Sequence, residues 1–378
     1  MQKLIIGITA EGSVVLLEGQ LKYFRDLGYE TYLLGPDSQR VREYCEKEGC
    51  TLLKINVRRE ISVIHDFFIL QRIIYIFFRI KPDIINLGTP KVSLLGMIAG
   101  KLLGVPKRIY TCRGFRFEPE NGFKRKMLIL MEKITVNCAS KVICISSSLR
   151  DFGVKNGIFT AAKAKVINKG SSNGINLTRF SPQSVTKESI YRLKKELGIE
   201  EKFIFGFVGR IYDRKGINEL CEAFSRLCQS LPDIVLLLVG RFEEAQIADK
   251  RIIEYIKSHS LIKHVGSQKN VPLYMSIMDV FVMPAWGEGF GNVMVEAAAM
   301  GIPVISTDAT GTKDSVCQDF NGLLIEPKSV DKLAETMKLM YSNRDLREKM
   351  GRNGVEWARN FDNLIIWNGL KELYNVER

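Results

Sequence analysis

Short apolar runs rich in β-branched residues alternate with stretches of helical periodicity along the whole chain, and this alternation restricts the fold more than any other feature. The strand-like runs are KLIIGIT, ETYLLG, KPDIINLG, KRIYTC and KVICIS in the first half, and EKFIFGFVGR, DIVLLLVGR, IKHVG, DVFVMPA, IPVISTD and NGLLIEP after residue 200. Apolar strands separated by helices are typical of parallel sheets with helices on both faces. The sequence therefore predicts an α/β protein built from doubly wound sheets.

The expected number of domains follows from the length and from one polar break. The chain has 378 residues, and a domain typically holds roughly 150. Residues 180–198 are polar and carry no strand pattern. We predict two halves that join near this stretch. The ligand site is expected in the cleft between them, because doubly wound folds bind ligands outside the carboxyl ends of their strands.

The charge of the chain is concentrated in its N-terminal half. Residues 1–180 hold 29 Lys and Arg against 15 Asp and Glu, whereas the rest holds 26 against 27. A basic half can meet nucleic acid, anionic lipid or a phosphorylated ligand, or can simply keep the protein soluble. The basic residues show neither aromatic interleaving nor a known nucleic-acid motif, so we do not expect a nucleic-acid partner.

Features that report on the compartment point to the cytosol. The eight cysteines form no CxxC pair, which favours reduced thiols over disulfides or a metal site. The start MQKLIIGIT has no cleavage site and is read as a first buried strand. Residues 61–80 are very apolar, but His, Asp, Gln and Arg interrupt them, which favours a largely buried helix over a membrane contact.

The stretch WGEGFGNVMVE, residues 286–296, joins a predicted strand to a predicted helix. Its glycines allow an anion to approach the backbone closely, and the start of a helix offers free N–H groups and partial positive charge. Gly289, Phe290 and Gly291 are therefore candidates to donate to a diphosphate. Glu296 is a candidate acceptor for a ribose diol, and Glu288 can reach the group attached to the phosphate. An ordinary acidic loop would look similar.

A second loop, in GRIYDRKG, is basic, and two of its cations are candidates for a ligand site. Arg210 and Lys215 lie between Gly209 and Gly216 at the end of a predicted strand. Two cations on a strand-to-helix loop can neutralise a diphosphate, above all as a leaving group. A solvated basic turn is the alternative, and it is less favoured because the acidic loop accompanies this one.

These two loops together resemble the retaining glycosyltransferases of family four. The motifs are GRIYDRKG and, about 80 residues later, EGFGNVMVEAAAMGIPVI; GQLKYFRDLGYE, KVICISSSL and GSSNGINLTRF are similar to that family as well. The resemblance covers nearly the whole chain. It is most similar to the bacterial capsule and O-antigen branch, which extends lipid-linked glycans.

The resemblance implies the GT-B fold, in which two Rossmann-like domains face a central cleft. It implies an acceptor-binding domain over 1–180, a linker over 181–199, a nucleotide-sugar-binding domain over 200–355, and C-terminal helices over 356–378 that cross back to the first domain. The implied partners are a nucleotide-sugar donor, with UDP favoured, and a glycan or undecaprenyl-diphosphate-linked acceptor. The family is metal-independent, so no cofactor and no metal are expected.

The resemblance also assigns roles to individual residues. Arg210, Lys215 and Glu288 would act at the reacting centre. The residues expected to bind the donor and its nucleotide are Gly12, Ser13, Gly209, Gly289, Phe290, Gly291, Asn292 and Glu296.

One segment departs from the family pattern. Many members have a histidine in the segment that here reads TCRGFRFE, and this chain has Arg113 there. Arg113 is therefore a candidate to bind phosphate or sugar hydroxyls, and Arg116 and Glu118 are weaker candidates for acceptor contacts. The change leaves the identity of the donor sugar open.

Two further expectations concern location and rival activities. GFKRKMLILMEK, residues 122–133, sets cations beside apolar residues and suits an interfacial helix, although a buried helix with a charged edge fits nearly as well. We expect a cytoplasmic protein held peripherally at the anionic inner face of the membrane. The alternatives are a UDP-sugar 2-epimerase of the same fold and a non-catalytic nucleotide-sugar sensor.

Overall fold

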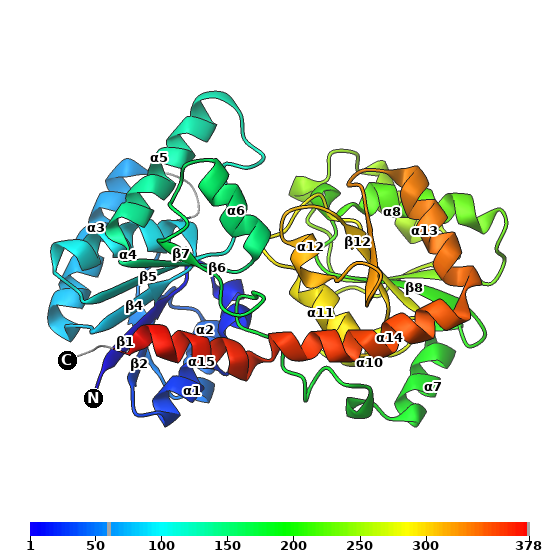
Figure 1. Cartoon of the computed structure of the whole chain (residues 1–378), viewed down its shortest axis with the longest axis horizontal. Helices are drawn as coiled ribbons and strands as arrows, with labels where there is room; N and C mark the ends of the chain where they lie inside the picture. Colours follow the sequence, from blue (N-terminus) through cyan, green and yellow to red (C-terminus); the bar gives the residue numbers. More distant parts are fainter. Residues whose placement is uncertain (59–61, 376–378) are drawn as a thin grey trace. The chain divides into compact units, whose positions relative to one another are not determined.

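The computed structural model describes residues 1–58 and 62–375, and its chain divides into two compact units (Figure 1). The first unit comprises Met1–Asn173 and Leu364–Arg378, and the second comprises Gly174–Asn363. The predicted linker, residues 181–199, contains a short 3₁₀ helix and the helix α7 (Lys187–Leu197), and it belongs to the second unit. Of the predicted C-terminal segment 356–378, the last three residues lie outside the described part.

The first unit is built on a parallel sheet with the order β3-β2-β1-β4-β5-β6-β7. The strand order reverses between β1 and β4, so the loops that follow these two strands diverge and leave room for a ligand. The strands are β1 (Lys3–Gly7), β2 (Glu30–Gly35), β3 (Thr51–Lys54), β4 (Ile84–Leu87), β5 (Lys107–Cys112), β6 (Lys141–Cys144) and β7 (Ala164–Lys165).

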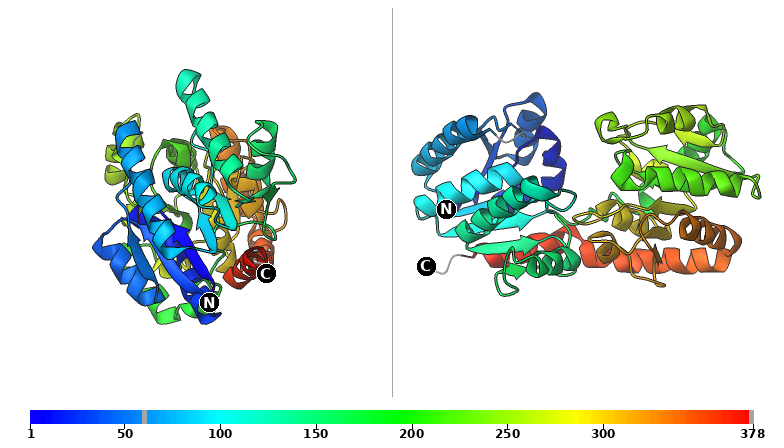
Figure 2. Two further views of the ribbon diagram at one scale, coloured as in Figure 1. Left: turned by 90° about the vertical axis from the view of Figure 1, so that its left-hand side faces the viewer. Right: turned by 90° about the horizontal axis from the view of Figure 1, so that it is seen from above.

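Helices cover both faces of this sheet (Figure 2). One face packs on α1, α2 and α15, whose core includes Phe24, Tyr44, Trp367 and Tyr374. On the other face α4 lies close to β4, since its glycines approach the side chains of Leu87 and Ile85, and α4 packs against both α3 and α5. The helices are η1 (Glu11–Leu17), α1 (Gln20–Asp26), α2 (Gln39–Glu48), α3 (Val63–Ile80), α4 (Pro90–Leu102), α5 (Gly122–Cys138), α6 (Ser147–Lys155) and α15 (Asn363–Tyr374).

The second unit repeats the plan with the order β10-β9-β8-β11-β12-β13, and neighbouring strands pair in parallel. Its order reverses between β8 and β11. The strands are β8 (Phe203–Val208), β9 (Ile234–Val239), β10 (Ile262–His264), β11 (Val280–Met283), β12 (Val304–Thr307) and β13 (Gly322–Ile325). These strands coincide with the six strand-like runs that the sequence shows after residue 200.

Helix pairs α8 with α13, and α11 with α14, pack on this second sheet. The helices are η2 (Pro182–Ser184), α7, η3 (Asp213–Lys215), α8 (Ile217–Cys228), η4 (Glu244–Gln246), α9 (Arg251–Ser258), α10 (Val271–Met275), α11 (Asn292–Ala299), α12 (Thr312–Ser315), α13 (Val330–Ser342), α14 (Arg344–Ala358) and η5 (Arg359–Phe361). The two units confirm the predicted pair of Rossmann-like domains.

The prediction of a largely buried helix over 61–80 is wrong for one of its faces. Residue 61 lies outside the described part, and α3 begins at Val63. One side of α3 buries Ile69, Ile73 and Phe77, but large apolar side chains on the other side face solvent. Helix α3 is therefore apolar on both of its faces but buried on only one of them.

Candidate functional site

In the second unit, two predicted loops meet where the strand order of the sheet reverses. One follows β8 and the other follows β11, and these strands are neighbours in the sheet. The N–H of Trp286 in the second loop donates to the carbonyl of Arg214 in the first (2.9 Å). Residues that are about 70 positions apart in the sequence thus form one surface at the carboxyl ends of the strands.

Two glycines with positive φ make this close approach possible. Gly216 has φ +73°, and a Cβ there would lie 2.1 Å from the carbonyl oxygen of Pro284. Gly311, in the loop after β12, has φ +76°, and a Cβ there would lie 2.2 Å from the carbonyl oxygen of Glu288. Since any other residue would clash and strain the backbone, these glycines bring three loops together around Glu288.

Lys215 and Glu288 form an ion pair between the two predicted loops. Their side chains are 13% and 21% exposed, so both charges are mostly removed from water while one side of each stays open. A mostly desolvated pair of this kind holds each partner in place, because neither charge is stable there alone. Two of the three predicted catalytic residues therefore lie in direct contact.

The segment between Glu288 and the start of α11 offers one unbonded backbone donor. Within the described residues, the N–H of Phe290 has no acceptor, so it is available to a ligand. The N–H of Gly291, which the sequence predicts to face a diphosphate, instead donates to the Oγ of Ser315 (2.9 Å). A Cβ at Gly291 would collide with the side chains of Met294 and Ser315. Close packing therefore accounts for a glycine at this position. Asn292 is the first residue of the helix.

Glu296 lies one turn further along α11 and is partly buried. Burial raises the pKa of its carboxyl to about 7, and the nearby positive charge of Arg179 opposes the rise. Within the described residues, no hydrogen-bond donor reaches this carboxylate. A desolvated acceptor without a donor is suited to receive hydrogen bonds from a ligand.

The other candidate cation of the first loop, Arg210, is arranged differently from Lys215. Arg210 is exposed, and its guanidinium lies 5.3 Å from the ring centre of Tyr212. Gly209 immediately follows β8 and links the strand to this arginine. Arg210 is thus exposed and makes no ion pair within the described residues, whereas Lys215 is paired with Glu288.

In the first unit, a pocket of about 300 Å³ opens at the reversal point between β1 and β4. Ser13 and Arg116, predicted for different ligands, both line it, and Lys91 lies between them at the start of α4. Lys91 is 4% exposed and forms an ion pair with Asp66 of α3 (2.7 Å). Gly12 is exposed, with open space around its Cα, so packing does not require a glycine there.

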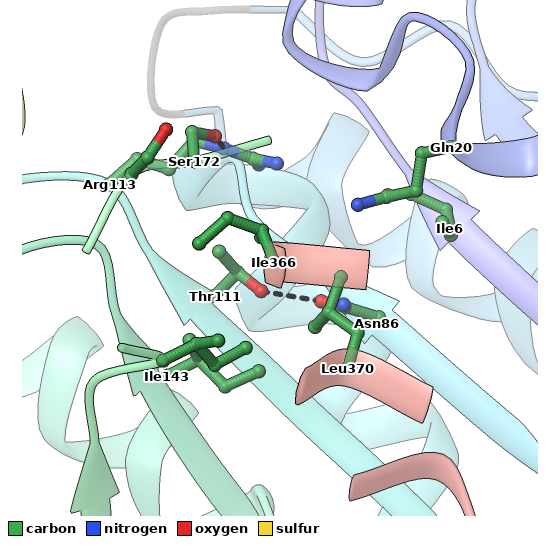
Figure 3. Close-up of a pocket in the computed structure, with 11 residues that line it drawn as sticks. Ile6, Gln20, Asn86, Thr111, Arg113, Ile143, Ser172, Ile366 and Leu370 are labelled. Atoms are coloured by element: carbon green, nitrogen blue, oxygen red, sulfur yellow. Dashed lines mark hydrogen bonds between the residues drawn. The ribbon is translucent and has the colours of Figure 1, made fainter. Parts of the chain in front are cut away.

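Arg113 lies elsewhere in the first unit, in a small cavity covered by α15 (Figure 3). Its Nε donates to the Oγ of Ser172 (2.7 Å), and burial lowers the pKa of its guanidinium to about 10. The amide of Gln20 points into the same cavity from the opposite side. The free space is about 10 Å³, roughly what one water molecule needs. Glu118 does not line this cavity or the pocket of Arg116.

Several residues that shape the site had not been predicted. Ser315 accepts from the Gly291 N–H, and the carbonyl of Thr310 accepts from the Glu288 N–H (2.8 Å). The indole Nε1 of Trp286 donates to Glu219 (2.8 Å). These contacts join segments that are far apart in the sequence. The small residues around Gly311 are the one sequence signal that indicates close packing there. In the described part of the chain, no three His, Cys, Asp or Glu side chains come together as metal ligands would.

Comparisons with known proteins find glycosyltransferase relatives for both units. A family model described as "Glycosyl transferases group 1" matches residues 190–357, and one described as "Glycosyl transferase 4-like" matches residues 5–146. The capsular polysaccharide biosynthesis glycosyltransferase CapM of Staphylococcus aureus is 34% identical over 379 residues, which covers 99% of this chain and 97% of that protein. The UDP-Gal:alpha-D-GlcNAc-diphosphoundecaprenol alpha-1,3-galactosyltransferase of Escherichia coli is 26% identical and covers 92% and 89%.

Solved structures show the same fold. The crystal structure of Anabaena Alr3699/HepE in complex with UDP has a TM-score of 0.81 at 21% identity, and the match covers 98% of this chain and 99% of that one. The structure of the same protein with UDP-glucose also has a TM-score of 0.81, at 20% identity. The likeness in fold extends over nearly the full length of both chains.

Proposed function

The chain belongs to the group 1 glycosyl transferases, in the GT-B type that serves bacterial surface polysaccharides, and we propose that it acts with retention and without a metal ion. The resemblance in the sequence motifs is thereby confirmed at the level of the family. The proposed donor is a UDP-linked hexose or N-acetylhexosamine. The proposed acceptor is a glycan on a lipid diphosphate, as the name of the Escherichia coli relative states for that enzyme.

The observation that carries this proposal is the contact between Lys215 and Glu288, two residues before Phe290, whose N–H has no acceptor within the described residues. The ion pair supplies a cation at Lys215, the N–H of Phe290 has no acceptor, and no hydrogen-bond donor reaches the carboxylate of Glu296 within the described residues. They match the parts of a nucleotide sugar: an anionic diphosphate, and a ribose that donates from two hydroxyls. The second unit is therefore our proposed donor domain.

The proposed reaction exchanges one bond at the anomeric carbon. The acceptor hydroxyl attacks on the face from which the leaving group departs. The bond from the anomeric carbon to the diphosphate oxygen breaks, and a bond to the acceptor oxygen forms. The proton of the acceptor passes to the departing phosphate, and a nucleoside diphosphate leaves. Lys215 and the exposed Arg210 would stabilise its growing negative charge, a task that a metal ion performs in other enzymes.

Glu288 has two tasks in this scheme. Its ion pair keeps Lys215 directed at the diphosphate site, and its second oxygen is available to the hydroxyls of the donor sugar. We propose that the first unit binds the acceptor. The pocket lined by Ser13, Lys91 and Arg116 offers positive charge at the reversal point of the first sheet.

A lipid-linked acceptor also implies a place in the cell. We propose that the protein works in the cytoplasm and attaches peripherally to the anionic inner face of the membrane. Within the described residues, no helix has the length and apolar content needed to cross a bilayer. The predicted interfacial segment forms the first part of α5, where Phe123 and Leu130 are exposed beside Lys124 and Lys126.

Thermal-shift measurements with UDP, GDP, ADP and dTDP, each with and without magnesium, test the donor site. We expect stabilisation by UDP that is equal in both conditions. A shift that needs magnesium contradicts the metal-independent site, and the absence of any shift contradicts the donor assignment.

Product analysis tests the reaction itself. The anomeric configuration of the transferred sugar, determined by NMR, should equal that of the donor. A donor sugar that changes without any acceptor would indicate an epimerase, and inversion of the anomeric centre would exclude the proposed mechanism.

A further inference from the structure

Helix α3 exposes an apolar surface that the donor and acceptor sites do not use. Its members, here called the α3 surface, are 56–80% exposed and recur at spacings of one helical turn. They are Val63, Ile64, Phe67, Phe68, Tyr75 and Phe78. Single exposed apolar residues are common on protein surfaces, but a continuous set of this size on one helix marks a contact surface.

The charges on the same helix indicate what covers this surface. Arg72 and Arg79 are exposed among the aromatic residues, and the guanidinium of Arg72 lies 6.0 Å from the ring centre of Tyr75. The acid of this helix, Asp66, turns inwards and pairs with Lys91. The exposed face of α3 thus combines aromatic and aliphatic side chains with cations and carries no acid, which is the composition of helices that lie in an anionic lipid interface.

A second copy of the chain is a poorer occupant. A twofold dimer brings the same surface from both subunits together. Here it would set Arg72 and Arg79 of one helix against those of another, with no exposed acid on either to balance them. Like charges in an interface cost free energy, whereas a bilayer that contains anionic lipids supplies the missing negative charge.

Helix α3 is linked to the pocket of the first unit by one ion pair. Asp66 lies in the same turns of α3 as Phe67 and Phe68, and its ion-pair partner Lys91 lines that pocket. We propose that the α3 surface inserts into the anionic leaflet and so holds the pocket next to the lipid headgroups. The inference rests on the proposed lipid-linked acceptor for its purpose, but membrane binding can be measured without any acceptor.

Flotation of the full chain with vesicles of phosphatidylglycerol and phosphatidylcholine tests the inference. The double variant Phe68→Ser/Phe78→Ser removes two side chains that are 62% and 63% exposed, so the fold should be retained. We expect the bound fraction to fall roughly tenfold or more, because apolar burial drives insertion. Binding of the unchanged chain should be weak on vesicles of phosphatidylcholine alone and should fall as salt is raised.

Matched variants separate this inference from the broader proposal. Tyr191→Ser changes a side chain of equal exposure (63%) on α7 in the second unit and should leave flotation unchanged. Phe123→Ser/Leu130→Ser alters the exposed side chains of α5. If only this α5 variant loses binding, the α3 inference is refuted while membrane attachment stands. If the unchanged chain does not float at low salt, both are refuted.

Two further measurements complete the test. The thermal shift produced by UDP should be the same in the α3 variant and the unchanged chain, which shows that the second unit is intact. Light scattering after size exclusion reports the oligomeric state. A dimer that the α3 variant abolishes, together with unchanged flotation, would assign the surface to a second copy and overturn the inference.

Discussion

Replacing Glu296 by glutamine should make the protein more stable and its donor complex weaker. Burial raises the pKa of this carboxyl from its ordinary 4.5 to about 7, so the charged form is disfavoured in the folded state. The folded protein therefore binds this proton more tightly than the unfolded chain does. Between pH 4.5 and 7 the folded state holds more protons, so the free energy of unfolding falls as pH rises.

The size of the effect follows from the difference between the two pKa values. A difference of about 2.5 corresponds to roughly 3 kcal/mol, and the partial exposure of Glu296 reduces this to about 1–2 kcal/mol. Glutamine does not titrate. Glu296→Gln should therefore change stability little at pH 4 and increase the free energy of unfolding by about 1–2 kcal/mol at pH 8.

Donor binding should respond in the opposite direction. The ionised carboxylate can accept from both ribose hydroxyls, whereas an amide retains a single acceptor oxygen. Hydrogen bonds to a charged group contribute about 1.5–3 kcal/mol, so the Kd for UDP should rise roughly tenfold at pH 8. Urea denaturation at pH 4 and pH 8 measures stability, and calorimetric titration with UDP measures affinity.

Glu132 provides the matched control for this test. It lies in α5 of the first unit, is 6% exposed and accepts from the hydroxyl of Tyr110 (2.8 Å). Burial raises the pKa of Glu132 to about 7 as well. Glu132→Gln should show a similar gain in stability at high pH with unchanged UDP affinity. Unchanged UDP affinity in Glu296→Gln would refute the ribose assignment. If the substitution changes the free energy of unfolding equally at pH 4 and pH 8, the raised pKa is refuted.

Two other substitutions test the reacting centre and the first core. Lys215→Ala should lower kcat by roughly 10²–10³-fold, because a charge at the leaving group is lost. The substitution also leaves Glu288 without its cation. Adding Glu288→Gln should therefore restore the melting temperature but not the kcat measured in a transfer assay. Recovery of kcat would contradict the role of Lys215. Trp367→Ala should cost about 3–5 kcal/mol, because this side chain packs against Gly19 and its Nε1 donates to Asn173 (2.8 Å). Hydrogen exchange should rise in the first unit alone, and equal loss in both units would contradict the assignment of α15 to the first core.

The central strands of both sheets could be predicted because they are buried on both faces and therefore read as continuous apolar runs. The edge strands of the first sheet could not. β3 is exposed at both of its ends, and β7 has only two residues. An edge strand pairs on one side and buries less surface, so its sequence carries little of the pattern that identifies a strand.

The sequence named single candidate residues but not their arrangement. The motifs identified Lys215 and Glu288, yet nothing in the sequence indicates that side chains 73 positions apart form an ion pair. Ser315 was missed because a serine that accepts from a backbone N–H has no distinctive neighbours in the sequence. The face that α3 exposes was missed for a different reason, since periodicity cannot reveal a surface when both faces of a helix are apolar.

The path of the chain through the first unit has a consequence for biosynthesis. The core of that unit contains Trp367, Leu370 and Tyr374, which follow the whole second unit in the sequence. As the polypeptide leaves the ribosome, the first 173 residues emerge without the helix that completes their core, whereas the second unit is continuous and has all of its parts once residue 363 has emerged. Nascent domains usually fold in the order of synthesis. Here the domain that begins first is the one that finishes last, and until then the apolar face that α15 covers has no partner from its own unit.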